Sequence, residues 1–507
     1  MTASSQAERV CLEYVVVATG ILLTGLFYVT VSQLVTVTAL LAMLLLLHRY
    51  QKTDPPNPDQ RPHADDGLWL TLLLPFSLLT GGNSYFHGDL YTFAEVVSSH
   101  TLLLSFAFVF KFPSRTINAL SVLWTTTLLF TLTNISVLWS VGTSVSSAFV
   151  FQHLTSSLWR YSPKSFTLGE LILVCQATTT FLATAGSSIA CSLVYGEDCM
   201  LNCSSSAAFL QAGLFSLAVL VAAVTNVAAL RRPSGFYAAV CLSAVSLVYP
   251  LCWVMVAAEP LGWLFSHIFN TTVRAALMAS WMVLTVAAIL FVSWYTRTYA
   301  DSSTIVRKVF HGVVILVFIP GVTLDPDLMY LACGSVMGVL VLLELVRALR
   351  MPPFGEDIHQ AFQMFLDEKD AGAFVLTPVY LFVGCATPLL LFPDRFGSSE
   401  KTLVLLSGTV SLGIGDTVAS VVGSKLGRHR WPGTKKTLEG TLASILAQFA
   451  FYFPLLYILT PKVWGLCTGL LVLVLCLNAY LEALTVQVDN LAIPVFMYPM
   501  MISLYAS

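Results

Sequence analysis

The chain has 507 residues, of which 57% are hydrophobic and only 10% are charged, and its mean hydropathy is +0.80. A soluble globular protein usually carries about 25% charged residues, so this composition excludes a soluble enzyme and indicates an integral membrane protein. The net charge of −2 gives no overall field that would favour nucleic acid as a partner.

Apolar runs of the length needed to cross a bilayer follow one another along almost the whole chain. Only helices satisfy their own backbone in lipid at this segment length, so we expect an all-α, polytopic membrane protein with about 13–16 transmembrane helices. The first ten residues lack a basic region followed by a cleavage site, and we expect the first run to be a retained segment. The runs lie near 14–30, 32–47, 68–82, 92–110, 116–141, 167–194, 207–229, 236–257, 276–295, 309–323, 328–346, 373–392, 402–422, 439–459, 463–480 and 491–506.

Basic residues mark every second loop of the C-terminal half, which places these loops in the cytoplasm by the positive-inside rule. The sequons at Asn202 and Asn270 fall in the alternate loops, so we expect both as lumenal glycosylation candidates. Lys111 and Arg115 fall on the other side by this count, which points to an error in one early span. The cytoplasmic loops contain Arg231 and Arg232; Arg297, Arg307 and Lys308; Arg347, Arg350 and Lys369; and Lys425 to Lys436.

Cys199 and Cys203 lie in a polar stretch, whereas most of the eleven cysteines lie inside apolar runs. In an oxidising lumen these two could form a disulfide, and two free thiols fit the sequence at least as well.

The most unusual segment is a basic loop that follows Gly413-Ile-Gly-Asp-Thr417. Five of the chain's 25 Lys and Arg residues lie within twelve positions, interspersed with glycines. Positive charge, open backbone N–H groups, the hydroxyls of Thr434 and Thr437 and a helix starting near Thr437 would suit a nucleoside triphosphate. The spacing is not that of a P-loop, and a basic loop touching anionic lipid fits the residues about equally well.

Asp416 lies at the end of an apolar run, where an unpartnered carboxylate costs roughly 3 kcal/mol or more. The functional interpretation is a Mg²⁺ ligand or a group that orients an attacking hydroxyl in phosphoryl transfer. The alternative is a helix N-cap before Thr417. The flanking glycines and the basic loop favour the functional interpretation.

Other polar groups have ordinary explanations when taken alone. The sequence from Glu356 to Asp370 predicts an interfacial amphipathic helix that ends in acidic residues. Glu344 and Arg347 are spaced as an i,i+3 ion pair. Arg307, Lys308 and His311 begin a span and have the character of a membrane anchor. A polar break between the last two spans has the character of a plain turn, with metal or ribose binding as the alternative; it contains Glu482, Gln487, Asp489 and Asn490.

The segments Leu412–Ser444, Phe365–Gly384 and Glu482–Asn490 together resemble the dolichol kinase family, and this resemblance covers about 200 C-terminal residues. It implies a division into an N-terminal multi-span membrane region (1–295) and a C-terminal CTP-dependent lipid kinase module (296–507). The candidate catalytic carboxylates are Asp416, Asp370 and Asp489, with no choice made between them for the base. The implied CTP-binding residues are Ser424, Lys425, Gly427, Arg428, Arg430, Gly433, Thr434, Lys435, Lys436, Thr437 and Glu439.

The resemblance further implies transfer of the CTP γ-phosphate to the hydroxyl of dolichol, with Mg²⁺ or Ca²⁺ as cofactor and Asp416 as the candidate metal ligand. The enzyme would lie in the endoplasmic reticulum membrane with its CTP site facing the cytoplasm. Its product, dolichyl phosphate, would supply N-glycosylation and mannosylation. No nucleic-acid partner is expected, and a homodimer is left open.

Three alternatives compete with this interpretation. A kinase for another isoprenoid or lipid alcohol, such as phytol or diacylglycerol, would differ only in its acceptor. A CDP-diacylglycerol-type cytidylyltransferase would release pyrophosphate from CTP, whereas a kinase releases CDP. A secondary transporter would place polar sites near the bilayer midplane of both halves. Here the polar groups gather in the cytoplasmic loops of one half, which argues against transport.

Overall fold

The computed structural model describes residues 3–26, 31–51, 61, 64–81, 89–112, 114–133, 135–196, 199–298, 303–363, 372, 374–391, 401–459 and 464–506. Within these ranges the chain is helical and contains no β-strand, which confirms the expected all-α class. The α-helices are α1 (Ala3–Leu26), α2 (Val31–Gln51), α3 (Leu73–Gly81), α4 (Asp89–Val109), α5 (Ser114–Leu132), α6 (Val137–Tyr161), α7 (Leu168–Tyr195), α8 (Ser205–Asn226), α9 (Pro233–Ser243), α10 (Tyr249–Val256), α11 (Pro260–Phe269), α12 (Thr272–Thr298), α13 (Ser303–Leu324), α14 (Pro326–Ala348), α15 (Gly355–Gln363), α16 (Thr377–Leu390), α17 (Thr402–Leu405), α18 (Ser407–Thr409), α19 (Thr417–Leu426), α20 (Leu438–Leu459), α21 (Trp464–Leu484) and α22 (Asp489–Ala506).

Eight helices in the described ranges are long and apolar enough to cross a membrane, and four shorter apolar helices accompany them. The chain is therefore a multi-pass membrane protein. The apolar run near 402–422 is not one straight helix, because a π-helical segment, η6 (Val410–Asp416), separates α18 from α19. The eight long helices span Leu90–Val109, Leu168–Tyr195, Ser205–Asn226, Pro233–Val256, Thr272–Tyr295, Pro326–Ala348, Leu438–Ile458 and Cys467–Leu484.

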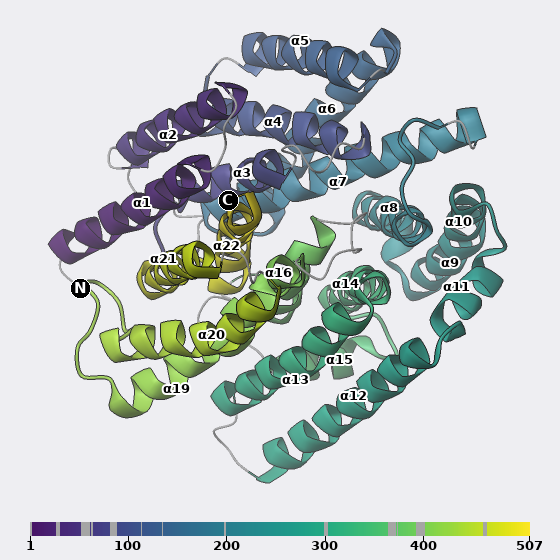
Figure 1. The fold of residues 1–507 in the computed structure, drawn as a ribbon. Helices are drawn as coiled ribbons and strands as arrows, with labels where there is room; N and C mark the ends of the chain where they lie inside the picture. Colours follow the sequence, from purple (N-terminus) through teal and green to yellow (C-terminus); the bar gives the residue numbers. More distant parts are fainter. Residues whose placement is uncertain are drawn as a thin grey trace.

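The C-terminal helix α22 lies at the centre of the molecule, between helices from both ends of the chain (Figure 1). It packs against α1, α3, α16, α18 and α21. Its side chains from Leu491 to Leu504 are all buried, as expected for a helix that is apolar on every face. One continuous core therefore joins the first helix to the last.

The region predicted as a single span near 116–141 consists of two helices, α5 and α6. The sequence pattern missed α6 because this helix is rich in Ser and Thr, whose hydroxyls lower its hydropathy. In the structure these hydroxyls bond to the preceding turn, as when Ser144 Oγ donates to the Ser140 carbonyl at 2.7 Å. With the extra helix, the short loop holding Lys111 lies at the same end of the bundle as the start of α7, which removes the conflict with the other basic loops.

The opposite end of α7 carries a disulfide between Cys191 and Cys199. The suggested pair of Cys199 with Cys203 is wrong, since Cys199 is bonded to Cys191. Cys191 could not be chosen from the sequence, because it lies inside an apolar run. The exposed Asn202 and Asn270 lie at this same end. There His267 contacts both Ser206 on α8 and Asp327 on α14.

Candidate functional site

The basic loop, residues 427–437, connects α19 to α20 and folds back on itself. The Trp431 N–H donates to the Lys436 carbonyl at 3.0 Å, and the Leu438 N–H donates to the His429 carbonyl at 2.8 Å. Gly433 occupies the tip with φ 66°, a conformation that L side chains rarely adopt. The Trp431 indole N–H also donates to Thr441 on α20 at 2.9 Å, so the loop is fixed to the helix that follows it.

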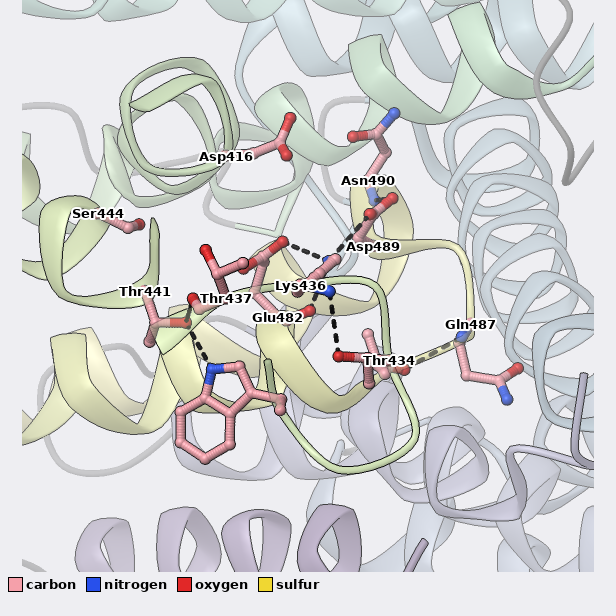
Figure 2. Close-up of polar contacts among 12 residues, drawn as sticks. Asp416, Thr434, Lys436, Thr437, Thr441, Ser444, Glu482, Gln487, Asp489 and Asn490 are labelled. Atoms are coloured by element: carbon pink, nitrogen blue, oxygen red, sulfur yellow. Dashed lines mark hydrogen bonds and ion pairs between the residues drawn. The ribbon is translucent and has the colours of Figure 1, made fainter. Parts of the chain in front are cut away.

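Lys436 points from this loop toward the turn between α21 and α22 (Figure 2). Its ammonium contacts the carboxylate of Glu482 and lies 3.6 Å from Oδ2 of Asp489. Burial acts to lower the pKa of the Lys436 amine, but the charges of Glu482 and Asp489 outweigh it and raise this pKa above its ordinary value. The amine therefore stays positively charged at every physiological pH.

The other four cations of the segment are exposed to solvent. Together with Lys436, which is 33% exposed, they give the loop and the end of α19 a dense positive charge. Multiply charged phosphate groups would suit such a surface. These four residues are Lys425, Arg428, Arg430 and Lys435.

Asp416, the last residue of η6, pairs with two side chains from the start of α13. Its Oδ2 lies 2.8 Å from Nζ of Lys308 and 3.3 Å from Nε2 of His311. Its backbone is helical and its side chain caps no N–H of α19, so the N-cap alternative is wrong. The anchor interpretation of Lys308 is also wrong, because this ammonium turns to a carboxylate of the protein.

The glycines beside the basic loop have a different role from the one predicted. A Cβ on Gly440 would lie 2.7 Å from the Ala419 carbonyl oxygen, and one on Gly423 would lie 2.9 Å from Thr437 Oγ1. These glycines therefore let α19 and α20 approach closely. The Gly427 N–H is not open to an oxyanion, because it donates to the Gly423 carbonyl at 3.1 Å.

The two threonines of the loop support its own backbone. Thr434 Oγ1 accepts from the Lys436 N–H at 3.2 Å, and Thr437 Oγ1 accepts from the Gly440 N–H at 3.2 Å, at the start of α20. This confirms the expected helix start near Thr437.

The remaining predicted residues fall into three groups. Ser424 is exposed at the end of α19, where its hydroxyl donates to the Val421 carbonyl. Glu439 accepts from the backbone and ring of His429, which ties the loop to the first turn of α20. Asp370 and the acidic group around it lie outside the described residues, while the helix predicted before them is present as α15.

The structure thus brings Asp416, Lys436 and Asp489 to one region and adds Glu482 to them (Figure 2). Sequence reasoning missed the roles of Lys308, His311 and Glu482. One signal could have found the first of these contacts: Asp416 and Lys308 each lie in an apolar run, where an ionised side chain needs a partner. Their separation of 108 residues hid the pairing.

The carboxylates fit a hard divalent cation in chemistry. Glu482, Asp489 and Asp416 offer oxygen donors only, and Mg²⁺ at phosphoryl-transfer sites often binds one or two carboxylates together with substrate phosphates. Within the described ranges, there is no group of three or more His, Cys, Asp or Glu side chains that could hold a metal ion by itself.

Comparison with known proteins places the chain in a family. The family model described as dolichol kinase matches residues 144–452. Dolichol kinases of Bos taurus and Homo sapiens are each 35% identical over 274 residues, which cover 52% of this chain and 51% of the relative. The chain thus spans about half the length of these mammalian relatives.

A more distant relative matches over a longer stretch. The dolichol kinase sec59 of Schizosaccharomyces pombe is 27% identical over 455 residues, covering 85% of this chain and 82% of that protein. No solved structure matches the chain.

Proposed function

Because the chain belongs to the dolichol kinase family, we propose that it transfers the γ-phosphate of CTP to the hydroxyl of dolichol. The products are dolichyl phosphate, the lipid carrier for N-glycosylation and mannosylation, and CDP. The observation that carries this proposal is the Lys436 ammonium, held among carboxylates at the base of a loop whose other cations are exposed. Positive charge for phosphates and carboxylates for a metal or a hydroxyl proton are what phosphoryl transfer requires.

The proposed donor site is the face of the basic loop. Lys436 contacts the phosphates as a point charge, while the exposed cations offset the remaining negative charge. Gly433 and Thr434 shape the tip of the loop. The remaining proposed nucleotide-binding residues are Ser424, Lys425, Gly427, Arg428, Arg430, Lys435, Thr437 and Glu439.

The proposed acceptor is the terminal hydroxyl of a long polyisoprenoid alcohol lying in the membrane. Its oxygen forms a bond to the γ-phosphorus, the bond from that phosphorus to the bridging β–γ oxygen breaks, and CDP leaves. The hydroxyl proton passes to one of the candidate carboxylates, Asp416, Asp370 or Asp489. An apolar helix bundle suits the tail, because each buried CH₂ contributes about 0.8 kcal/mol.

Mg²⁺ or Ca²⁺ is the proposed cofactor, and Asp416 and Asp489 are the residues that would hold it. When bound, it would offset the charge of the nucleotide phosphates. The carboxylate-only donor set supports a hard cation over zinc or copper.

We further propose that the site faces the cytoplasm, in the endoplasmic reticulum membrane. Two observations support this orientation. The basic residues gather at the end of the bundle that carries Lys436, and the Cys191–Cys199 disulfide lies at the opposite end of α7, as expected for an oxidising lumen. In the same proposal, residues 296–507 form the kinase module and 1–295 the N-terminal membrane region, while a homodimer is left open.

The test is phosphate transfer from γ-labelled CTP to dolichol in membranes that express this chain, with γ-labelled ATP as the control donor. Label in dolichyl phosphate from CTP, and little from ATP, is the expected result. Label released as pyrophosphate would replace the kinase by a cytidylyltransferase. No consumption of CTP with either metal would leave the basic loop as a contact for anionic lipid.

A further inference from the structure

The turn between α21 and α22 separates the two carboxylates that face Lys436. Glu482 lies just before the turn and Asp489 just after it, so residues 484–488 set the spacing between these two side chains. Side chains from the first 170 residues of the chain bond to this turn.

Glu170, at the start of α7, is the centre of these bonds and is fully buried. Its Oε1 accepts from the Val488 N–H at 2.7 Å and from Arg61 Nη2 at 2.9 Å. Its Oε2 accepts from Arg61 Nη1 at 3.1 Å and from the Thr167 N–H at 2.9 Å, which completes a capping box. One carboxylate therefore joins the cap of α7, an arginine and the backbone of the turn.

Arg61 and Thr167 extend the contact to the rest of the turn. Arg61 Nη2 donates to the Val486 carbonyl at 3.1 Å. Thr167 Oγ1 donates to Gln487 Oε1 at 2.6 Å, and Gln487 Nε2 donates to Asp65 Oδ1 at 2.7 Å. Both ends of the Gln487 amide are thereby used, by two different N-terminal segments.

The backbone around Gln487 also allows this close approach. Gly67 has φ 60°, and a Cβ there would lie 2.4 Å from the Gln487 side chain. A Cβ on Gly169 would lie 1.9 Å from the Gly67 carbonyl oxygen. Arg9 adds a bond to the Leu484 carbonyl at 3.2 Å and pairs with Asp65.

Stability alone does not explain this network, because burying charged groups has a large desolvation penalty. Five ionisable side chains lie almost completely inside the protein, and apolar residues of the same volume often serve stability as well. Directional bonds to backbone atoms instead fix one arrangement of the turn. The five are Arg9, Glu13, Arg61, Asp65 and Glu170.

We propose that Arg61, Thr167 and Glu170 are positioning residues of the nucleotide site, acting through Gln487 and the turn to place Glu482 and Asp489 around the Lys436 ammonium. The inference rests on the proposed function and deepens it. The N-terminal region then forms part of the kinase site itself, in addition to any role in the membrane.

The experiment compares Glu170→Gln and Gln487→Ala in the full-length chain, using KM for CTP, KM for dolichol and kcat. Each variant removes a bond to the turn, while Lys436, Glu482 and Asp489 themselves are not substituted. We expect KM for CTP to rise about tenfold or more, as for the loss of a charge-assisted hydrogen bond, with KM for dolichol unchanged. Amide exchange at residues 486–489 should also become faster.

The matched control is Asp325→Asn, which weakens the Arg274 ion pair at the other end of the molecule. It should lower stability and leave KM for CTP unchanged. If Glu170→Gln does not fold, Gln487→Ala carries the test alone. Faster amide exchange with KM for CTP within twofold of wild type would overturn the positioning role. A wild-type chain that transfers no phosphate from CTP would overturn the proposed function, and this inference with it.

Discussion

Two ion clusters lie at opposite ends of α13 and differ in what surrounds them. At one end, Arg274 pairs with Asp325 at 2.6 Å and also contacts Asp327. At the other end, Lys308 pairs with Asp416, and Lys436 faces its two carboxylates nearby. About 25 Å of helix separates Lys308 from Asp325, close to the thickness of a bilayer core.

The difference shows that an ion pair in a membrane protein is not by itself a sign of function. Arg274 is 11% exposed and its bonds join α12 to the start of α14. Lys436 is 33% exposed and lies beside a loop that carries further exposed cations. A partly open charge next to several exposed charges of the same sign indicates a ligand site, whereas an enclosed pair indicates a joint between helices.

The largest expected effect comes from Lys436→Ala. This change removes a charge for the CTP phosphates and touches no apolar face, so phosphate transfer should fall at least about a hundredfold while membrane insertion is retained. The measurement is label transfer from CTP to dolichol at equal protein level. Normal activity in this variant would remove Lys436 from the site.

Asp416→Asn should have the next largest effect. The amide keeps the shape of the side chain but loses the charge that faces Lys308 and any bound cation, so kcat should fall about a hundredfold. Titration of activity with Mg²⁺ provides the measurement, and Asp416→Glu serves as the charge-retaining comparison. An unchanged rate in Asp416→Asn would assign this carboxylate to structure alone.

Gly440→Ala should have a moderate effect that originates in packing. Its Cβ would press on the Ala419 carbonyl and separate α19 from α20, at a cost of about 1–3 kcal/mol in folding free energy. Thermal unfolding of the purified protein measures this loss, with Ala substituted at the open position Gly465 as control. Equal melting temperatures for the two variants would contradict the close-packing role of Gly440.

Arg274→Gln should affect stability and not the use of CTP. Loss of its charge leaves Asp325 without its main partner, so the melting temperature should fall. KM for CTP should stay at the wild-type value, in contrast to the positioning variants near Lys436. A rise in KM for CTP would mean that the two ends of the molecule are coupled, and the distinction between the clusters would fail.

Much of this organisation could be predicted from local sequence. Hydropathy indicated the helices, and the cost of a carboxylate in an apolar run singled out Asp416. α6 was missed because hydroxyl groups that bond to their own helix count as polar in any hydropathy scale.

The partners within the site could not be predicted, because they depend on packing between distant segments. Lys308 is 108 residues from Asp416, and Glu170 is 318 residues from Val488. Each contact arises only once α13 lies against η6 and α7 lies near the last turn. The glycines beside the loop were misinterpreted, because a glycine can serve either to leave backbone N–H groups open or to let two helices pack closely. The local sequence does not distinguish these two uses.

The smallest expected effect tests whether the two clusters lie on opposite sides of a membrane. Asn202 and Asn270 are exposed at the end that carries the disulfide, so glycosylation there would place this end in the lumen. Wild-type protein from microsomes should move faster on a gel after endoglycosidase treatment, and the Asn202→Gln, Asn270→Gln double variant, which keeps the sequon at Asn134, should show a smaller shift. Activity should be unchanged, because both asparagines lie at the opposite end of the helices from Lys436. An engineered sequon in the exposed basic loop that gains a glycan would reverse the orientation and place the CTP site on the wrong side for a cytoplasmic nucleotide.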